Sequence, residues 1–272
     1  MGYNLSVSPS RRPKLGQHFL SSEGYRRRIV NSLALRPEDL VIEVGPGRGA
    51  MTELLAERAG RVVAVELDAG LASDLLRKLE HQPGVEVIQG DILATDVKEI
   101  CRKRGAKSCF VFGNLPYYIT SPIIHHLMNS AGVIRGMALL VQREVAERLT
   151  AQPGTRDYGY LSVRVRVHSE PRIAMGVPPG AFSPPPKVHS ALVEFAMKPK
   201  FPAWTAQDLA AFLEFIQRCF AQKRKNLLNN LGQVFSKDRL RQTLDRLHLP
   251  PTARAEELTV EQFAELREKL KG

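Results

Sequence analysis

Short apolar runs alternate with longer segments of helical pattern through the first half of this chain, and this alternation constrains the fold most strongly. Segments such as AMTELLAERA (50–59) and AGLASDLLRKLE (69–80) have helical periodicity. Strands that alternate with helices are joined as βαβ units, which build a mostly parallel sheet, so we predict an α/β fold. The runs with strand character are LVIEV (40–44), RVVAVEL (61–67), VEVIQGD (85–91), SCFVFGN (108–114), GMALLVQ (136–142) and ALVEF (191–195).

Residues 143–170 are harder to interpret. EVAERL (144–149) has a helical pattern, whereas LSVRVRVHS (161–169) alternates with period two, which is typical of a strand. Periodicity alone does not settle the conflict. PPGAFSPPPKVHS (178–190) contains too many prolines for a regular element, and we expect an ordered loop there.

The composition changes at KPKFPAWTA (198–206), and residues 207–272 contain amphipathic helical patterns without a convincing strand. We therefore expect a domain boundary near residue 200. Residues 1–28 are basic and loop-like in composition. The predicted division is a basic N-terminal arm (1–28), an α/β domain (29–200) and a helical C-terminal domain (201–272).

The chain carries 39 basic and 28 acidic residues, a net charge of +11. Such an excess favours a polyanionic partner, because neutralising phosphates releases counterions, so a nucleic acid is expected. No apolar run approaches the roughly 18 residues of a membrane span, and the first residues lack a secretory apolar core. The cysteines have neither disulfide-framework nor zinc-ligand spacing. We expect a cytoplasmic monomer with no metal and no membrane partner.

A glycine-rich turn, EVGPGRGAMT (43–52), joins the first predicted strand to a helix. Glycines there allow a tight turn and a close approach of a ligand to a helix N-terminus. Gly45, Gly47 and Gly49 are spaced G-x-G-x-G, unlike the G-x-G-x-x-G of dinucleotide-binding folds, and no P-loop lysine follows. Taken alone, the glycines fit either a ligand site or a simple turn.

Acids follow the next two predicted strands. Glu66 ends the second strand, where a carboxylate can accept both hydroxyls of a ribose, and Asp91 ends the third. Ligands of parallel sheets bind beyond the carboxyl ends of the strands, so the glycine turn and both acids should share one crevice. Gly45, Gly47, Glu66 and Asp91 together resemble the S-adenosylmethionine site of class I methyltransferases. The resemblance implies a Rossmann-like, mostly parallel seven-stranded sheet, with Glu66 at the ribose, Asp91 at the adenine amine and the glycines beside the methionine part.

The fourth strand ends in NLPY (114–117), a tetrad that resembles the motif of enzymes that methylate an exocyclic amine of a nucleobase. Such an amine is a weak nucleophile, because its lone pair is delocalised into the ring. If the Asn114 carboxamide and a backbone carbonyl of Leu115 or Pro116 accept its N–H bonds, the lone pair can point at the methyl donor. Tyr117 can stack on the extruded base. No strong base is required, since the proton can leave after methyl transfer.

Further segments resemble the ribosomal RNA adenine N6-dimethyltransferase family, and in order they are most similar to its small-subunit (16S) members. The resemblance runs from about residue 11 to the C-terminus and implies N6,N6-dimethylation of two adjacent adenosines near the 3′ end of 16S rRNA, in the small subunit or its precursor. It also implies a helix in place of a strand at LSVRVRVHS, followed by a strand near PRIAMGV (171–177). The segments are LGQHFL (15–20), NLPYYITSPII (114–124), FSPPPKVHSALV (182–193), FAQKRKNLLNNL (220–231) and RAEELTVEQFAEL (254–266).

The resemblance assigns roles at both ends of the chain: a cofactor-covering loop within residues 1–28, and binding of rRNA or the ribosome by the helical domain 201–272. His18 and Leu20 match cofactor-contacting positions, with Asn114 as a further one, in a loop that covers S-adenosylmethionine. Two basic clusters are candidates for contacts with the rRNA backbone. They are Arg11, Arg12 and Lys14 in the N-terminal arm, and Lys223, Arg224 and Lys225 in QKRKN. A solvated helix face is an equally good explanation for the second cluster.

Two alternatives stay open at this point. One is a 23S rRNA adenine N6-methyltransferase, against which the proline-rich and C-terminal segments argue. The other is a protein that acts mainly as a binding factor in small-subunit assembly, with methylation as a secondary role. The complete set of motifs favours an enzyme with a role in small-subunit biogenesis.

Overall fold

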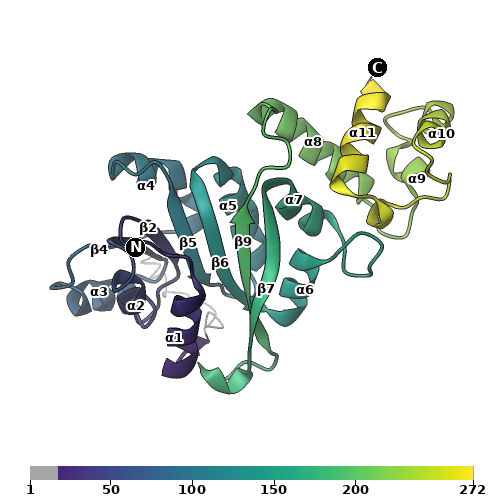
Figure 1. Ribbon diagram of the computed structural model, residues 1–272. Helices are drawn as coiled ribbons and strands as arrows, with labels where there is room; N and C mark the ends of the chain where they lie inside the picture. Colours follow the sequence, from purple (N-terminus) through teal and green to yellow (C-terminus); the bar gives the residue numbers. More distant parts are fainter. Residues whose placement is uncertain (1–17, 272) are drawn as a thin grey trace, which may run out of the picture.

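A computed structural model describes residues 18–271, and its centre is a sheet of seven strands in the order β4-β3-β2-β5-β6-β9-β7 (Figure 1). β9 pairs antiparallel with both β6 and β7, and the other pairings in this sheet are parallel. The predicted mostly parallel seven-stranded sheet is therefore confirmed. The strands are β2 (Leu40–Val44), β3 (Arg61–Glu66), β4 (Val85–Gln89), β5 (Cys109–Asn114), β6 (Ile134–Gln142), β7 (Ser169–Val177) and β9 (Ser190–Met197).

Helices cover both faces of the sheet, which explains why its central strands are apolar without interruption. On β2, Leu40 and Ile42 belong to a core cluster with α4, α5, α6 and α7, whereas Val41 packs with α1 and α2 on the other face. The two-residue period of a strand thus divides one apolar run between two cores. The helices on the sheet are α1 (Glu23–Ser32), α2 (Thr52–Ala56), α3 (Ala69–Lys78), α4 (Val97–Lys103), α5 (Thr120–Asn129), α6 (Arg143–Thr150) and α7 (Tyr160–His168).

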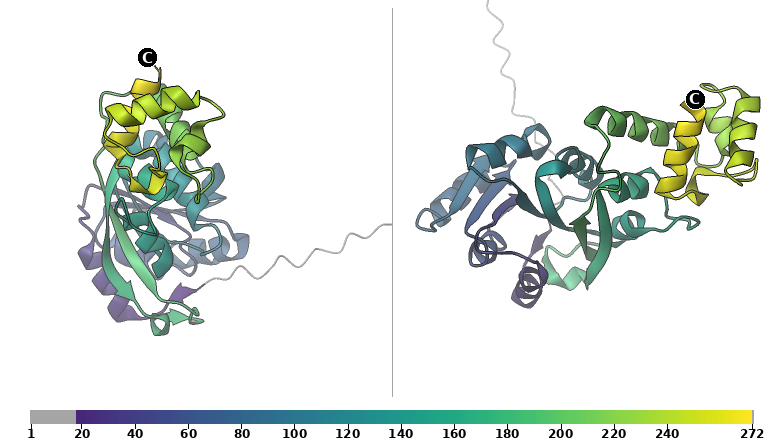
Figure 2. Two further views of the ribbon diagram at one scale, coloured as in Figure 1. Left: turned by 90° about the vertical axis from the view of Figure 1, so that its right-hand side faces the viewer. Right: turned by 45° about the horizontal axis from the view of Figure 1, so that its top comes forward.

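The C-terminal helices lie at the opposite end of the molecule from α3 and β4 (Figures 1 and 2). Their core includes Val163 and Val167 of α7, and the Tyr158 hydroxyl donates to the Leu258 carbonyl at 3.0 Å. This core therefore extends across residue 200, where the sequence predicts a boundary. The helices are α8 (Ala206–Cys219), α9 (Leu227–Leu231), α10 (Lys237–Arg246) and α11 (Val260–Lys271).

One local conflict is settled and two local predictions are wrong. LSVRVRVHS lies almost wholly in α7 and PRIAMGV lies in β7, so the helix and the following strand that the resemblance implies are confirmed against the two-residue period. The N-terminal arm is not loop-like to residue 28, because α1 begins at Glu23. The proline-rich segment is not wholly irregular: a 3-10 turn at Pro179–Ala181 precedes a two-residue strand, β8 (Phe182–Ser183), which pairs antiparallel with β1 (Phe19–Leu20).

The strand order reverses between β2 and β5: β3 and β4 are added on one side of β2, and β5 and β6 on the other. This is the topological switch point of the sheet. Ligands of open α/β sheets bind at such a point, beyond the carboxyl ends of the strands. No helix between residues 18 and 271 is long and apolar enough to cross a membrane.

Candidate active site

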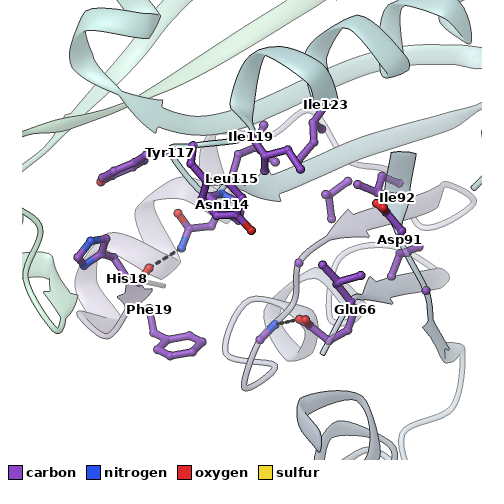
Figure 3. Close-up of a pocket in the computed structure, with 18 residues that line it drawn as sticks. His18, Phe19, Glu66, Asp91, Ile92, Asn114, Leu115, Tyr117, Ile119 and Ile123 are labelled. Atoms are coloured by element: carbon purple, nitrogen blue, oxygen red, sulfur yellow. Dashed lines mark hydrogen bonds between the residues drawn. The ribbon is translucent and has the colours of Figure 1, made fainter. Parts of the chain in front are cut away.

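A cleft with about 850 Å³ of empty space opens at the carboxyl edge of β2, β3, β4 and β5 (Figure 3). Each of these strands delivers one part of the predicted site to it, since parallel strands end at the same edge. The predicted residues among those that line the cleft are His18, Gly45, Gly47, Glu66, Asp91, Asn114, Leu115, Pro116 and Tyr117.

Glu66 holds the glycine turn against the end of β3. One carboxylate oxygen, Oε2, accepts the Gly47 N–H at 2.9 Å, and the other, Oε1, accepts the Asp68 N–H at 3.0 Å. Each oxygen keeps a second lone pair, so the buried carboxylate can still accept a ribose hydroxyl. Glu66 therefore also fixes the turn, in addition to the ribose role that its position predicts.

The glycine turn leaves room for a ligand. Gly45 and Gly47 both have positive φ, 67° and 57°, which side chains rarely tolerate. A Cβ on Gly47 would lie 2.7 Å from the Phe19 ring, whereas a Cβ on Gly45 would meet nothing within 4 Å. The Phe19 ring thus packs on the turn, and the open space at Gly45 belongs to the cleft.

Asp91 and two apolar residues form the far end of the cleft. The Asp91 Oδ1 accepts the Leu93 N–H at 2.9 Å and caps the short 3-10 helix Ile92–Ala94. Leu67 follows Glu66, Ile92 follows Asp91, and both line the cleft. Two apolar side chains beside an acid suit the flat ring and the amine of an adenine.

Glu43 lies on β2 behind the glycine turn and is 2% exposed. Burial raises the pKa of its carboxyl to about 7, the Thr52 hydroxyl beside it acts in the opposite direction, and the charge of Glu66 raises it further. One oxygen of Glu43 and the Thr52 hydroxyl are buried without a properly oriented hydrogen bond among the described residues. Burying this carboxyl is energetically costly, and Glu43 does not line the cleft.

Asn114 is the last residue of β5, and its carboxamide is oriented by the N-terminal segment. The side-chain Nδ2 donates to the His18 carbonyl at 2.9 Å (Figure 3). This bond uses one of the two N–H groups of Nδ2 and fixes the orientation of the carboxamide, so Oδ1 remains able to accept a hydrogen bond from a ligand. The orientation therefore matches a ligand that carries N–H groups.

The two backbone carbonyls after Asn114 are not equivalent. The Pro116 carbonyl accepts the Ile119 N–H at 3.2 Å and the Thr120 hydroxyl at 3.0 Å. The Leu115 N–H donates to Leu140 on β6 at 3.0 Å, but no donor reaches the Leu115 carbonyl from the rest of residues 18–271. Of the two carbonyls that the sequence offers, that of Leu115 has the free acceptor capacity.

Tyr117 lies beside Asn114 with its ring half-buried. Its hydroxyl forms a 2.8 Å hydrogen bond with the Ser190 hydroxyl. The His18 ring stacks on the Tyr117 ring, with 5.5 Å between the ring centroids. Desolvation raises the pKa of the Tyr117 hydroxyl, so it stays neutral at physiological pH. The ring offers an apolar face without a charge.

These residues fit S-adenosylmethionine, which supplies an electrophilic methyl group on a sulfonium when it is bound. Glu66 can hold the ribose, the open side of Gly45 can take the methionine part, and Asp91 with Leu67 and Ile92 can hold the adenine.

The remaining predicted residues lie elsewhere. Leu20 is buried in a core cluster and does not line the cleft, so its side chain cannot contact the cofactor there. Lys223, Arg224 and Lys225 are exposed on the turn between α8 and α9, not on a helix face. The Asn230 side chain orders this turn by donating to the Cys219 and Gln222 carbonyls at 2.7 and 3.2 Å. Arg11, Arg12 and Lys14 lie outside the described residues.

The sequence interpretation misses several residues of the cleft. Leu67 and Ile92 could have been found, because each directly follows a predicted strand-end acid. Phe19 sits inside the LGQHFL segment, but its contact with Gly47 depends on the pairing of β1 with β8. Ser190 comes from a strand that is antiparallel to its neighbours, and no local pattern indicates that it reaches Tyr117.

Comparisons with known proteins agree with this geometry. A family model described as ribosomal RNA adenine dimethylase matches residues 9–271. The chain is 41% identical over 262 residues to the ribosomal RNA small subunit methyltransferase A of Acidobacterium capsulatum. The alignment covers 96% of this chain and 92% of that protein. It is 40% identical to the protein of the same name from Latilactobacillus sakei, with 94% of this chain and 88% of that protein covered.

Two solved structures share the fold over nearly the whole chain. A dimethyladenosine transferase from Plasmodium falciparum has a TM-score of 0.78 and 25% identity, with 93% of this chain and 98% of that chain covered. The 23S rRNA methyltransferase ErmE has a TM-score of 0.71 and 28% identity, with 93% and 100% covered. The chain therefore belongs to the ribosomal RNA adenine dimethylase family, the S-adenosylmethionine-dependent class I methyltransferases that modify rRNA adenines.

Proposed function

We propose that this enzyme transfers methyl groups from S-adenosylmethionine to N6 of two adjacent adenosines near the 3′ end of 16S rRNA, giving N6,N6-dimethyladenosine at both. The observation that carries the proposal is the orientation of Asn114, which lines the cleft and whose carboxamide is fixed by the bond from Nδ2 to the His18 carbonyl, with Oδ1 as its acceptor. An acceptor in this place suits an amine that has to be held by its N–H bonds.

The reaction follows from two acceptors and one ring. The Asn114 Oδ1 and the Leu115 carbonyl accept the two N–H bonds of the adenine amine, which favours a pyramidal nitrogen with its lone pair aimed at the methyl group. The Tyr117 ring stacks on the extruded base and replaces the stacking lost in the RNA. Attack forms the N–C bond as the C–S bond breaks, and the cationic amine then releases a proton to water. Pro116 shapes the turn but is not an acceptor.

The amine can pass through the site twice. After one methyl transfer it keeps a single N–H, which either acceptor can hold. Groups that act by hydrogen bonding alone do not change their protonation or covalent state during a transfer. A second transfer therefore requires only a new cofactor and room for the first methyl group.

The cofactor contacts proposed here are those of Gly45, Gly47, Glu66, Asp91 and Asn114, with His18 acting through its backbone. Leu20 is left out of this set, because it does not line the cleft. For the rRNA, Lys223, Arg224 and Lys225 present three charges on one ordered, exposed turn, which suits backbone phosphates. Arg11, Arg12 and Lys14 are proposed to extend this contact. Residues 201–272 would then serve as the part of the enzyme that recognises the ribosome.

A small-subunit substrate is favoured over a 23S substrate by the degree of similarity. The relatives named small subunit methyltransferase A are about 40% identical over nearly the whole chain, against 28% for the 23S enzyme. We further propose that the protein is a monomer, acts in the cytoplasm and takes part in small-subunit biogenesis. A pure assembly factor would not need the oriented amide of Asn114.

The test is incubation of immature small subunits with S-adenosylmethionine labelled in its methyl group, followed by mass spectrometry of the rRNA nucleosides. We expect label in N6,N6-dimethyladenosine from two adjacent positions of 16S rRNA. Label confined to 23S rRNA, or to a nucleoside other than adenosine, would overturn the proposal.

A further inference from the structure

The proline-rich segment FSPPPKVHSALV (182–193) has no part in the function proposed above, although it touches the site at both of its ends. At its start, Phe182 and Ser183 form β8 and pair with β1, and the Pro184 carbonyl accepts a hydrogen bond from the His18 ring at 2.8 Å. At its end, the Ser190 hydroxyl meets the Tyr117 hydroxyl at 2.8 Å. The segment therefore borders the cleft on the side of the base.

Ser190 reaches this place because β9 is antiparallel to its neighbour. The parallel strands bring their last residues to the cleft, whereas β9 brings its first. Ser190 pairs with Gln142 of β6 and with Val177 of β7, so its backbone is held from both sides. The residue is 1% exposed. Its hydroxyl is thus fixed by the sheet and not by a mobile loop.

Tyr117 needs such a support. It lies on the turn after β5 and is only half-buried, so packing alone does not determine the plane of its ring. The His18 ring stacks against the Tyr117 ring, with centroids 5.5 Å apart, and Tyr117 lines the cleft in which a base would lie. Stacking depends on the plane of the ring, and the hydroxyl at its tip is the point from which that plane can be held.

We propose that Ser190 is a positioning residue that holds the Tyr117 ring in the plane required to stack on the target adenine. The proposal rests on the function proposed above and adds a residue to it. Ser190 does not touch the cofactor or the base. It acts through one hydrogen bond, so its effect must depend on the Tyr117 hydroxyl.

The experiment is a double-mutant cycle of Ser190→Ala and Tyr117→Phe, measured with unmodified small ribosomal subunits and the full-length enzyme. Each single variant removes one hydroxyl of the pair and keeps the fold and the ring. We expect each to lower kcat/KM for the RNA substrate about five- to tenfold, as for loss of one hydrogen bond. The double variant should be no worse than the poorer single variant.

Ser169→Ala is the matched control, because Ser169 is also a buried strand serine, and its hydroxyl donates to the Val165 carbonyl at 3.0 Å, away from the cleft. We expect kinetics within twofold of wild type for it, and an unchanged S-adenosylmethionine Kd for all variants.

Two results would overturn the role of Ser190: wild-type kcat/KM for Ser190→Ala, or losses that multiply in the double variant. A wild-type enzyme that fails to methylate small-subunit rRNA would instead contradict the proposed function, and the role of Ser190 with it.

Discussion

The two ends of the cleft use opposite kinds of polar group. At the cofactor end, the Glu66 and Asp91 carboxylates are held by backbone N–H groups, which fix their oxygens in place. At the base end, Asn114 offers an amide oxygen, Leu115 offers a carbonyl and Tyr117 offers an uncharged ring. Hydroxyls and an amine on a cationic cofactor are well served by acids, whereas an amine that must act as a nucleophile needs acceptors that do not compete for its proton. Each end can therefore be broken separately.

The largest effect is expected at the base end. Asn114→Ala removes the acceptor that orients the amine, so kcat should fall about 10²- to 10³-fold, as when one oriented transition-state contact is lost. S-adenosylmethionine binding, followed by calorimetry, should change far less. Asn114→Asp is the matched variant. It keeps an oxygen but sets a carboxylate against the His18 carbonyl, and we expect it to be impaired as well. A methylation rate near wild type for Asn114→Ala would remove the assigned role.

Glu66→Gln tests the cofactor end. The amide would place an NH2 group against the Gly47 or the Asp68 N–H, so the glycine turn and the ribose contact should weaken together. We expect the Kd of S-adenosylmethionine to rise about 30- to 100-fold, on the basis of charge-assisted hydrogen bonds. The kcat at saturating cofactor should change little. A large loss of kcat with an unchanged Kd would show that the two ends are not separable.

Much of this comparison could be predicted from sequence, because strand-end residues of a parallel sheet share an edge. The glycine turn, Glu66, Asp91 and NLPY line the cleft as expected. α7 could not be predicted from periodicity. Its valines Val163, Val165 and Val167 are all buried, and between them Arg166 donates to the Thr150 and Ala151 carbonyls. A helix surrounded by protein has no polar face to reveal its period.

The contacts that orient the site were also beyond a local pattern. The bond from Asn114 to His18 joins residues 96 positions apart, and that from Tyr117 to Ser190 joins residues 73 apart. Each depends on the path of the segments that form β1, β8 and β9. The chemistry of the site could thus be predicted from types of residue, and its orientation could not.

Glu43 lies behind the cofactor end, and we expect it to affect the free energy of unfolding. The folded pKa of Glu43 is about 7, above the ordinary value of 4.5. The contribution of this group to the free energy of unfolding is therefore fully present below pH 4.5 and is lost as the pH rises through 7, because the unfolded chain releases the proton first. We expect Glu43→Gln to be more stable than wild type by about 2 kcal/mol at pH 8 and by little at pH 5. Urea unfolding at both pH values measures this. A difference that does not depend on pH would place the pKa of Glu43 in its ordinary range.

The smallest effect is expected from Asp91→Asn. The amide oxygen can keep the bond to the Leu93 N–H, but the amide then turns an NH2 group toward the adenine amine, so two donors face each other. Loss of one hydrogen bond at a partly exposed site should raise the Kd of S-adenosylmethionine about three- to tenfold without changing kcat. Asp96→Asn is the control, since Asp96 caps α4 through the Lys98 N–H at 2.8 Å and does not line the cleft. Equal effects of the two substitutions on cofactor binding would show that Asp91 acts only as a cap, and the adenine would then have to be held by Leu67 and Ile92 alone.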